Sequence, residues 1–109
     1  MELHLIRHGQ TNWNEERRSQ GQSDSVLTDL GIAQAKKLGE KIEDIQFDSV
    51  YCSSSVRTRQ TAEHAFAGQA ELHQKIIYLD SLREIFLGPW EGVLYDDIEK
   101  DDPDSYQHF

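Results

Sequence analysis

The order of apolar and amphipathic segments constrains the fold of this chain more than any other feature. Short apolar runs at residues 2–7, 47–52 and 76–79 have the length of buried strands, and the segments 29–44 and 56–67 between them have the character of helices. Strands that alternate with helices are typical of a parallel sheet. The sequence therefore predicts an α/β fold, in which chemistry is carried where the strands end.

The helix expected at 29–44 has clear start signals. Thr28 is a favourable N-cap, and Asp29 suits the positive end of the helix that follows. Apolar residues then recur at helical spacing: Ala35, Leu38, Ile42 and Ile45. In the helix expected at 56–67, the packing face consists of Ala62, Ala65 and Phe66. Residues 8–27 and 82–92 are expected to be loops, and a further helix near 94–100 should end before Pro103.

Polar side chains follow the first apolar run directly. Arg7, His8 and Gly9 come where the strand 2–7 is expected to end. A guanidinium offers a rigid fork of donors to phosphate oxygens, and a neutral imidazole nitrogen can attack phosphorus. Nearby arginines should favour the neutral ring, because a second positive charge is unfavourable there. Taken alone, the pair also fits two polar residues that simply end a strand.

The pattern Arg7-His8-Gly9-x-Thr11, followed by Asn14, resembles the opening signature of the histidine phosphatase superfamily, which includes the cofactor-dependent phosphoglycerate mutases. Further blocks resemble the family in order along nearly the whole chain: Gln20-Gly21, Leu27-Thr28-x-x-Gly31-x-x-Gln34-Ala35, Ser53-Ser54 with Arg57 and Gln60-Thr61-Ala62, and Leu82-Arg83-Glu84 with Gly88-Pro89-Trp90-Glu91-Gly92. The resemblance implies a phosphoglycerate mutase-like, three-layer α/β sandwich with a parallel sheet.

The resemblance also implies roles for particular residues. His8 would carry the phosphoryl group, Arg7 and Arg57 would grip phosphate with Asn14 as a further donor, and Glu84 would be the catalytic acid. A carboxyl group must be protonated to donate, so we expect partial burial to raise the pKa of Glu84. Glu91 is the second candidate for the acid. The implied substrate is a small phosphorylated molecule, and neither a cofactor nor a metal is expected.

The chain departs from the family pattern in two ways. The family has a second histidine, usually next to a glycine, and none of the remaining histidines matches it: His4, His64, His73 and His108. The family domain also normally continues well beyond Phe109, so residues 1–109 are expected to be a partial domain, shortened at its C-terminus. Such a domain would have an open sheet edge and an apolar face, which a homodimer could cover, and weak or no activity.

Several alternatives remain open at this point. Cys52 precedes Arg57 at a turn from strand to helix, but Cys-x4-Arg is one residue shorter than the cysteine phosphatase motif. A non-catalytic module that binds phosphate or a protein partner would also lack the second histidine. Phosphatases and mutases share the motifs above, and a phosphatase acting on phosphomonoesters is favoured because 95–109 does not match the mutase insertion. The acidic stretch 96–104 lacks the pattern of a calcium loop and is expected to be solvated.

Charge and composition exclude several kinds of partner. The net charge is −9, and it is uneven, because residues 1–59 hold 8 Lys/Arg and 9 Asp/Glu whereas residues 60–109 hold 3 and 11. Nucleic acid needs a basic surface, so it is not an expected partner. No apolar run reaches the length of a membrane span. The single cysteine and the absence of a signal-like N-terminus favour the cytoplasm.

Overall fold

The computed structural model describes residues 1–107 of this chain and consists of short helices around a small parallel sheet. Its elements, in chain order, are α1 (Asn12–Glu16), α2 (Asp29–Ile42), β1 (Tyr51–Ser53), α3 (Val56–Ala65), α4 (Ala70–His73), β2 (Ile77–Leu79), the 3-10 turns η1 (Asp80–Leu82) and η2 (Gly88–Trp90), α5 (Tyr95–Asp101) and α6 (Pro103–Gln107). None of these helices is long and apolar enough to cross a membrane.

The sheet consists of β1 and β2, which run parallel, with Cys52 opposite Tyr78 in the register. The helix α3 connects them, so the chain forms a strand–helix–strand unit, as the sequence predicts. The α/β class with a parallel sheet is therefore confirmed. Both strands are shorter than expected, because residues 47–50 and Ile76 lie outside the paired segments.

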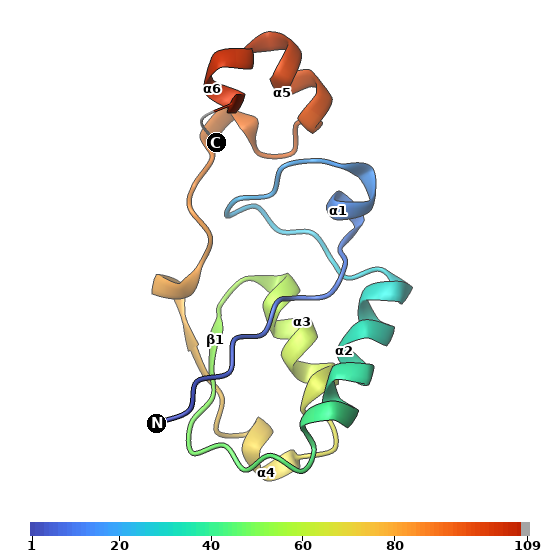
Figure 1. Ribbon diagram of the computed structural model, residues 1–109, viewed down its shortest axis with the longest axis vertical. Helices are drawn as coiled ribbons and strands as arrows, with labels where there is room; N and C mark the ends of the chain where they lie inside the picture. Colours follow the sequence, from blue (N-terminus) through green and yellow to red (C-terminus); the bar gives the residue numbers. More distant parts are fainter. Residues whose placement is uncertain (108–109) are drawn as a thin grey trace.

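The strand predicted at residues 2–7 does not form among the described residues. The segment is drawn as an extended trace that passes in front of β1 (Figure 1), but it belongs to no sheet. Leu3 and Leu5 are 73% and 88% exposed. An apolar run shows which side chains favour burial, but a strand also needs a neighbouring backbone to pair its N–H and C=O groups. The prediction was wrong because that neighbour is absent here.

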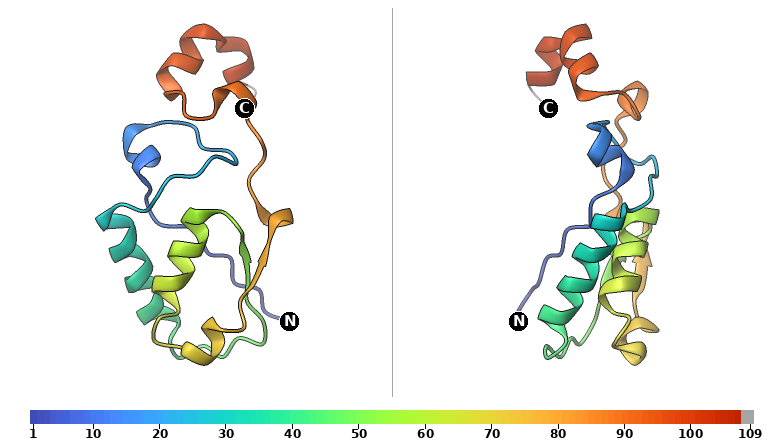
Figure 2. Two further views of the ribbon diagram at one scale, coloured as in Figure 1. Left: turned by 180° about the vertical axis from the view of Figure 1, so that it is seen from behind. Right: turned by 90° about the vertical axis from the view of Figure 1, so that its right-hand side faces the viewer.

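The helices α2 and α3 lie side by side and pack closely against each other (Figures 1 and 2). Thr28 caps α2 as predicted, since its Oγ1 accepts the Gly31 N–H at 3.1 Å. A Cβ on Gly39 would stand 2.5 Å from the Ala65 carbonyl oxygen, so this glycine permits the close approach of the two helices. The buried cluster is made of Ile42, Cys52, Ala62, Ala65, Phe66 and Ile76, and it includes the packing face expected for α3.

Two segments contain more helix than expected. The predicted loop 8–27 includes α1, whose N-cap Thr11 forms a capping box with Asn14. The helix α5 ends at Asp101, but Pro103 then opens α6, because proline lacks an N–H that the first turn of a helix does not need. The pair α5 and α6 lies at one end of an elongated molecule of 47 × 28 × 20 Å, beyond α1 (Figure 1).

Candidate active site

His8 lies where the extended N-terminal segment meets α2 and α3. Its ring is half-buried, and its Nδ1 donates to the carbonyl oxygen of Gly9 at 2.6 Å. A carbonyl oxygen can only accept, so this bond requires the proton of a neutral ring to be on Nδ1. The Nε2 atom then keeps its lone pair, which is the requirement for a nucleophile.

The surroundings of His8 hold its pKa below the ordinary value of 6.5. Burial is the largest cause, and the positive charges of Arg57 and Arg7 act in the same direction. The hydrogen bond to Gly9 and the carboxylate of Glu84 oppose the shift without reversing it. The expected preference for the neutral ring is confirmed in direction, with burial contributing more than the arginines.

The backbone next to His8 is fixed by close contacts with two helices. The Gly9 N–H donates to Thr61 Oγ1 on α3 at 3.0 Å, and the Gln10 N–H donates to Gln34 Oε1 on α2 at 2.9 Å. A Cβ on Gly9 would lie 2.4 Å from the Gly31 carbonyl oxygen, and a Cβ on Gly31 would lie 2.1 Å from the Gln10 carbonyl oxygen. These motif residues therefore position the histidine loop.

Arg57 lies in the first turn of α3, as the sequence predicts, and it is buried. Its Nη2 donates to the Gly21 carbonyl at 2.7 Å and its Nη1 to the Ser23 carbonyl at 3.0 Å. A guanidinium has five N–H donors, so these two bonds leave others for a ligand. Burial lowers the pKa of Arg57, and the negative charges of Asp24, Glu84 and Glu91 oppose that shift.

The start of α3 already has an anionic partner within the chain. Asp24 Oδ1 accepts the Val56 N–H at 3.0 Å and so caps the helix. Asp24 therefore supplies a negative charge at the helix start where Arg57 lies.

The remaining predicted site residues differ in how they are placed. Arg7 is exposed and shares with His8 the lining of a cavity of about 230 Å³; the other lining residues are Gly9, Gln34, Ala35, Leu38 and Thr61. Glu84 is close enough to affect the pKa of His8, but it is exposed, so its predicted burial was wrong. The residues that follow it, Ile85 and Phe86, are 64% and 69% exposed, so this part of the loop is not packed against the rest of the chain.

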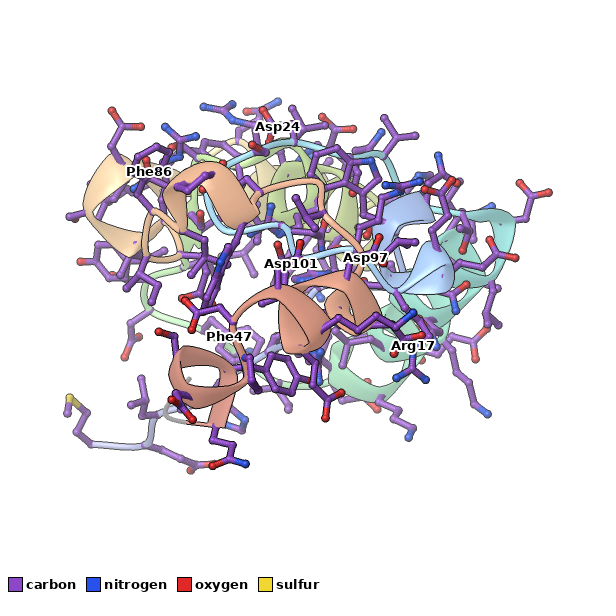
Figure 3. The ribbon with its side chains drawn as sticks, turned by 90° about the horizontal axis from the view of Figure 1, so that it is seen from above. Arg17, Asp24, Phe47, Phe86, Asp97 and Asp101 are labelled. Carbon is purple, nitrogen blue, oxygen red and sulfur yellow. The ribbon has the colours of Figure 1, made fainter. Side chains whose placement is uncertain are left out.

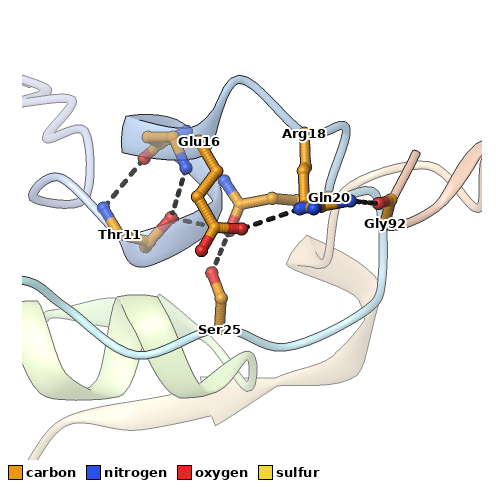
Figure 4. Close-up of polar contacts among 7 residues, drawn as sticks. Thr11, Glu16, Arg18, Gln20, Ser25 and Gly92 are labelled. Atoms are coloured by element: carbon orange, nitrogen blue, oxygen red, sulfur yellow. Dashed lines mark hydrogen bonds and ion pairs between the residues drawn. The ribbon is translucent and has the colours of Figure 1, made fainter. Parts of the chain in front are cut away.

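Asn14 forms hydrogen bonds with Thr11 and has no recorded contact with His8. Its Oδ1 accepts the Thr11 N–H at 3.0 Å, while its own N–H donates to Thr11 Oγ1 at 3.1 Å. The Thr11 hydroxyl donates to Gln20 Oε1 at 3.0 Å, and Ser25 donates to the same oxygen at 2.6 Å (Figure 4). The motifs did not indicate this structural role, yet Thr11 and Gln20 are both buried and hold the loop together.

Two charged residues have roles that the sequence did not indicate. Arg18 is half-buried and donates to the Gly92 carbonyl oxygen at 2.8 Å and to Glu16 at 2.7 Å (Figure 4). The pKa of Glu91 is lowered, because hydrogen bonds from Ser23, Gln22 and Leu87 outweigh the opposing effect of desolvation. An ionised Glu91 is poorly suited to act as the acid.

The structure disfavours the cysteine alternative. Cys52 is buried on β1, and burial raises the pKa of its thiol despite the opposing effects of Thr58 and Arg59. A cysteine nucleophile needs the opposite shift, since the thiolate is the reactive form.

The other histidines do not gather around His8. His4 lies in the N-terminal segment beside Phe47, His64 lies on α3 and His73 on α4. His108 is outside the described residues.

Figure 3 shows Asp97 and Asp101 on α5, at the end of the molecule formed by α5 and α6. Within residues 1–107, no group of three His, Cys, Asp or Glu side chains is arranged to hold a metal ion.

Comparison with known proteins gives the family. The model of the histidine phosphatase superfamily (branch 1) matches residues 3–109. This chain belongs to that superfamily. Phosphoglycerate mutase-like protein 4 of Arabidopsis thaliana is 35% identical over 109 residues, which are 99% of this chain and 46% of that protein. The probable phosphoglycerate mutase GpmB of Salmonella choleraesuis is 37% identical over 94% of this chain and 46% of its own length.

Solved structures of similar proteins share the fold of this chain. Bacillus stearothermophilus YhfR superposes with a TM-score of 0.84 at 44% identity, over 94% of this chain and 50% of that one. The α-ribazole phosphatase of Shigella flexneri gives a TM-score of 0.81 at 32% identity, over 94% and 49%. The chain therefore spans about half the length of the family members that it matches.

Proposed function

We propose that this histidine phosphatase family member hydrolyses small phosphomonoesters through a phosphohistidine formed on His8. The observation that carries the proposal is the hydrogen bond from His8 Nδ1 to Gly9, which leaves Nε2 as the free nucleophile of a ring whose charge is disfavoured by Arg7 and Arg57. Solved neighbours that are named as phosphatases support hydrolysis as the reaction.

The proposed reaction has two steps. His8 Nε2 attacks phosphorus and the bond to the ester oxygen breaks, while Glu84 gives its proton to that oxygen. Water then attacks the phosphohistidine, Glu84 takes the proton from the water, and inorganic phosphate leaves with Nε2 restored. Arg7 and Arg57 stabilise the charge on the phosphoryl oxygens, with Asn14 as a further donor. Because none of the described histidines other than His8 stands where the family's second histidine would, we expect weak activity from this chain.

A mutase activity is the second candidate. The specific support is that relatives similar over nearly the whole chain are named as phosphoglycerate mutases or as mutase-like. The same phosphohistidine would then pass its phosphoryl group to a second hydroxyl of a phosphoglycerate instead of to water.

Hydrolysis of an aryl phosphate tests the proposal, with this chain and its His8→Ala variant compared with and without vanadate. Turnover that vanishes in His8→Ala and is blocked by vanadate supports it, and His64→Ala serves as the control because His64 lies in the last turn of α3, at the opposite end of the helix from Arg57. Affinity for phosphate without turnover, also in a family protein of full length that contains this sequence, would favour a binding module. Transfer to phosphoglycerate that exceeds transfer to water would favour the mutase.

We further propose that two copies of this chain associate through the exposed apolar surface around the sheet. Tyr51 and Ile77 pair in register and are 58% and 45% exposed, and Leu3 and Leu5 add two more uncovered side chains. Apolar surface of this kind favours association over exposure to water.

The single, buried Cys52 is compatible with a reducing compartment, so we place the protein in the cytoplasm.

A further inference from the structure

Glu91 joins two loops that are far apart in sequence. Its Oε2 accepts the Gln22 N–H and the Leu87 N–H, each at 3.0 Å, and its Oε1 accepts the Ser23 hydroxyl. The carboxylate therefore connects the loop 19–23 with its own segment, residues 87–93. A carboxylate that accepts several such bonds remains charged, and the bonds are stronger than those between neutral groups.

The same loop is shaped to receive this carboxylate. Gly21 has a φ of +55°, and a Cβ at this position would stand 2.4 Å from Glu91 Oε2. A side chain at residue 21 would thus meet both an unfavourable backbone conformation and the carboxylate itself. Backbone bonds add to the connection, because the Gly92 N–H donates to the Ser19 carbonyl at 2.8 Å and the Ser19 N–H to the Val93 carbonyl at 2.9 Å.

The opposite side of the loop holds Arg57. The Gly21 and Ser23 carbonyls accept its two Nη groups at 2.7 and 3.0 Å, and the Gln22 carbonyl between them accepts Arg83 Nη2 at 2.8 Å. Glu91 therefore binds the donors of residues 22 and 23, while the arginines bind the acceptors of residues 21–23. The position of the loop sets the orientation of the Arg57 guanidinium.

We propose that Glu91 is a positioning residue, which orients Arg57 for phosphate binding through the loop 19–23. The inference rests on the proposed function only in taking Arg57 as a phosphate ligand. It differs from a catalytic role for Glu91, because the carboxylate neither gives nor takes a proton and acts on the site through Gly21 and Ser23.

A double-mutant cycle on inorganic phosphate binding tests this role. Glu91→Ala should weaken phosphate binding about tenfold, a coupling size that is usual within one hydrogen-bonded network. In an Arg57→Ala background the same change should have less than about a twofold effect, because the residue through which Glu91 acts is gone. Equal effects in both backgrounds would overturn the proposal. Glu40→Ala, an exposed glutamate on α2, is the matched control and should leave binding unchanged.

A second readout does not depend on any ligand. In NMR spectra, Glu91→Ala should speed amide exchange of Gln22 by at least about tenfold and broaden the Arg57 Nε–H signal, while Glu40→Ala changes neither. An unchanged Arg57 signal would refute the positioning role. Ser23→Ala, which removes a single bond to Glu91, should give the same changes in smaller size if Glu91→Ala does not fold. If the unaltered chain binds no phosphate, the proposed function fails, and the NMR result alone decides the role of Glu91.

Discussion

At the scale of single residues, His8 combines a fixed tautomer with a lowered pKa. Because burial and two arginines disfavour its charged form, the folded chain binds fewer protons on His8 than the unfolded chain below pH 6.5. We therefore expect stability to fall as the pH drops below this value, and the His8 ring signals in NMR to titrate with a midpoint below 6.5.

Arg7→Ala should raise the midpoint of the His8 titration, since it removes one of the two positive charges near the ring while the ring stays half-buried. Arg17→Ala, the loss of an exposed cation outside the site, is the control and should leave the midpoint in place. A His8 midpoint at or above 6.5 in the unaltered chain would contradict this electrostatic account.

The importance of Glu84 as a general acid should depend on how readily the leaving group of the substrate departs without a proton. Loss of a general acid typically costs about 10²–10⁴ in rate, so Glu84→Gln should reduce kcat/KM, which reports the first step alone, by about this factor for an alkyl phosphate. For nitrophenyl phosphate we expect a much smaller loss, because that leaving oxygen departs without a proton. Steady-state kinetics with both substrates tests this, and Glu99→Gln on α5 is the control. Equal losses for the two substrates would remove Glu84 from the acid role.

At the scale of elements, the contact between α2 and the histidine loop leaves no room for a side chain. Gly31→Ala would gain about 1 kcal/mol of helix propensity, but its Cβ would lie 2.1 Å from the Gln10 carbonyl oxygen, a backbone atom that cannot turn aside. Overpacking of this kind costs about 1–3 kcal/mol, so we expect a net decrease in the free energy of unfolding.

Urea denaturation measures this change, with Gly68→Ala as the matched control. No atom lies within 4 Å of a Cβ built on Gly68, and its variant should stay within about 0.5 kcal/mol of the original chain. A Gly31→Ala variant as stable as Gly68→Ala would contradict this account, because it would show that the histidine loop can shift to make room for the added Cβ.

At the scale of the whole molecule, the proposed dimer should make stability depend on concentration. A chain that folds together with a second copy has a Tm that rises with protein concentration, whereas a monomer does not. We expect light scattering to give twice the monomer mass, and the change of Leu3 and Leu5 to serine to give the monomer mass. Leu30→Ser, a change at an exposed leucine on α2, should preserve the dimer. A concentration-independent Tm together with monomer mass would rule the dimer out.

The sequence by itself determined the local features of this protein. The capping of α2 by Thr28, the periodic packing face of α3 and the position of Arg57 in its first turn follow from short-range rules, and they agree with the structure. The ordered motifs also indicated the family, which the match over residues 3–109 confirms. The caps, the packing face and each motif depend on residues within a few positions of one another, so the pattern along the chain contains the necessary information.

Only the tertiary structure decided the features that join distant segments. It showed that residues 2–7 remain unpaired, that Asp24 caps a helix 32 residues further along, and that Glu91 holds residues 22 and 23 instead of acting as an acid. A strand needs a neighbouring backbone, and a carboxylate takes its role from the donors that folding brings to it. Sequence spacing does not reveal such partners, because they depend on which distant segments come into contact when the chain folds.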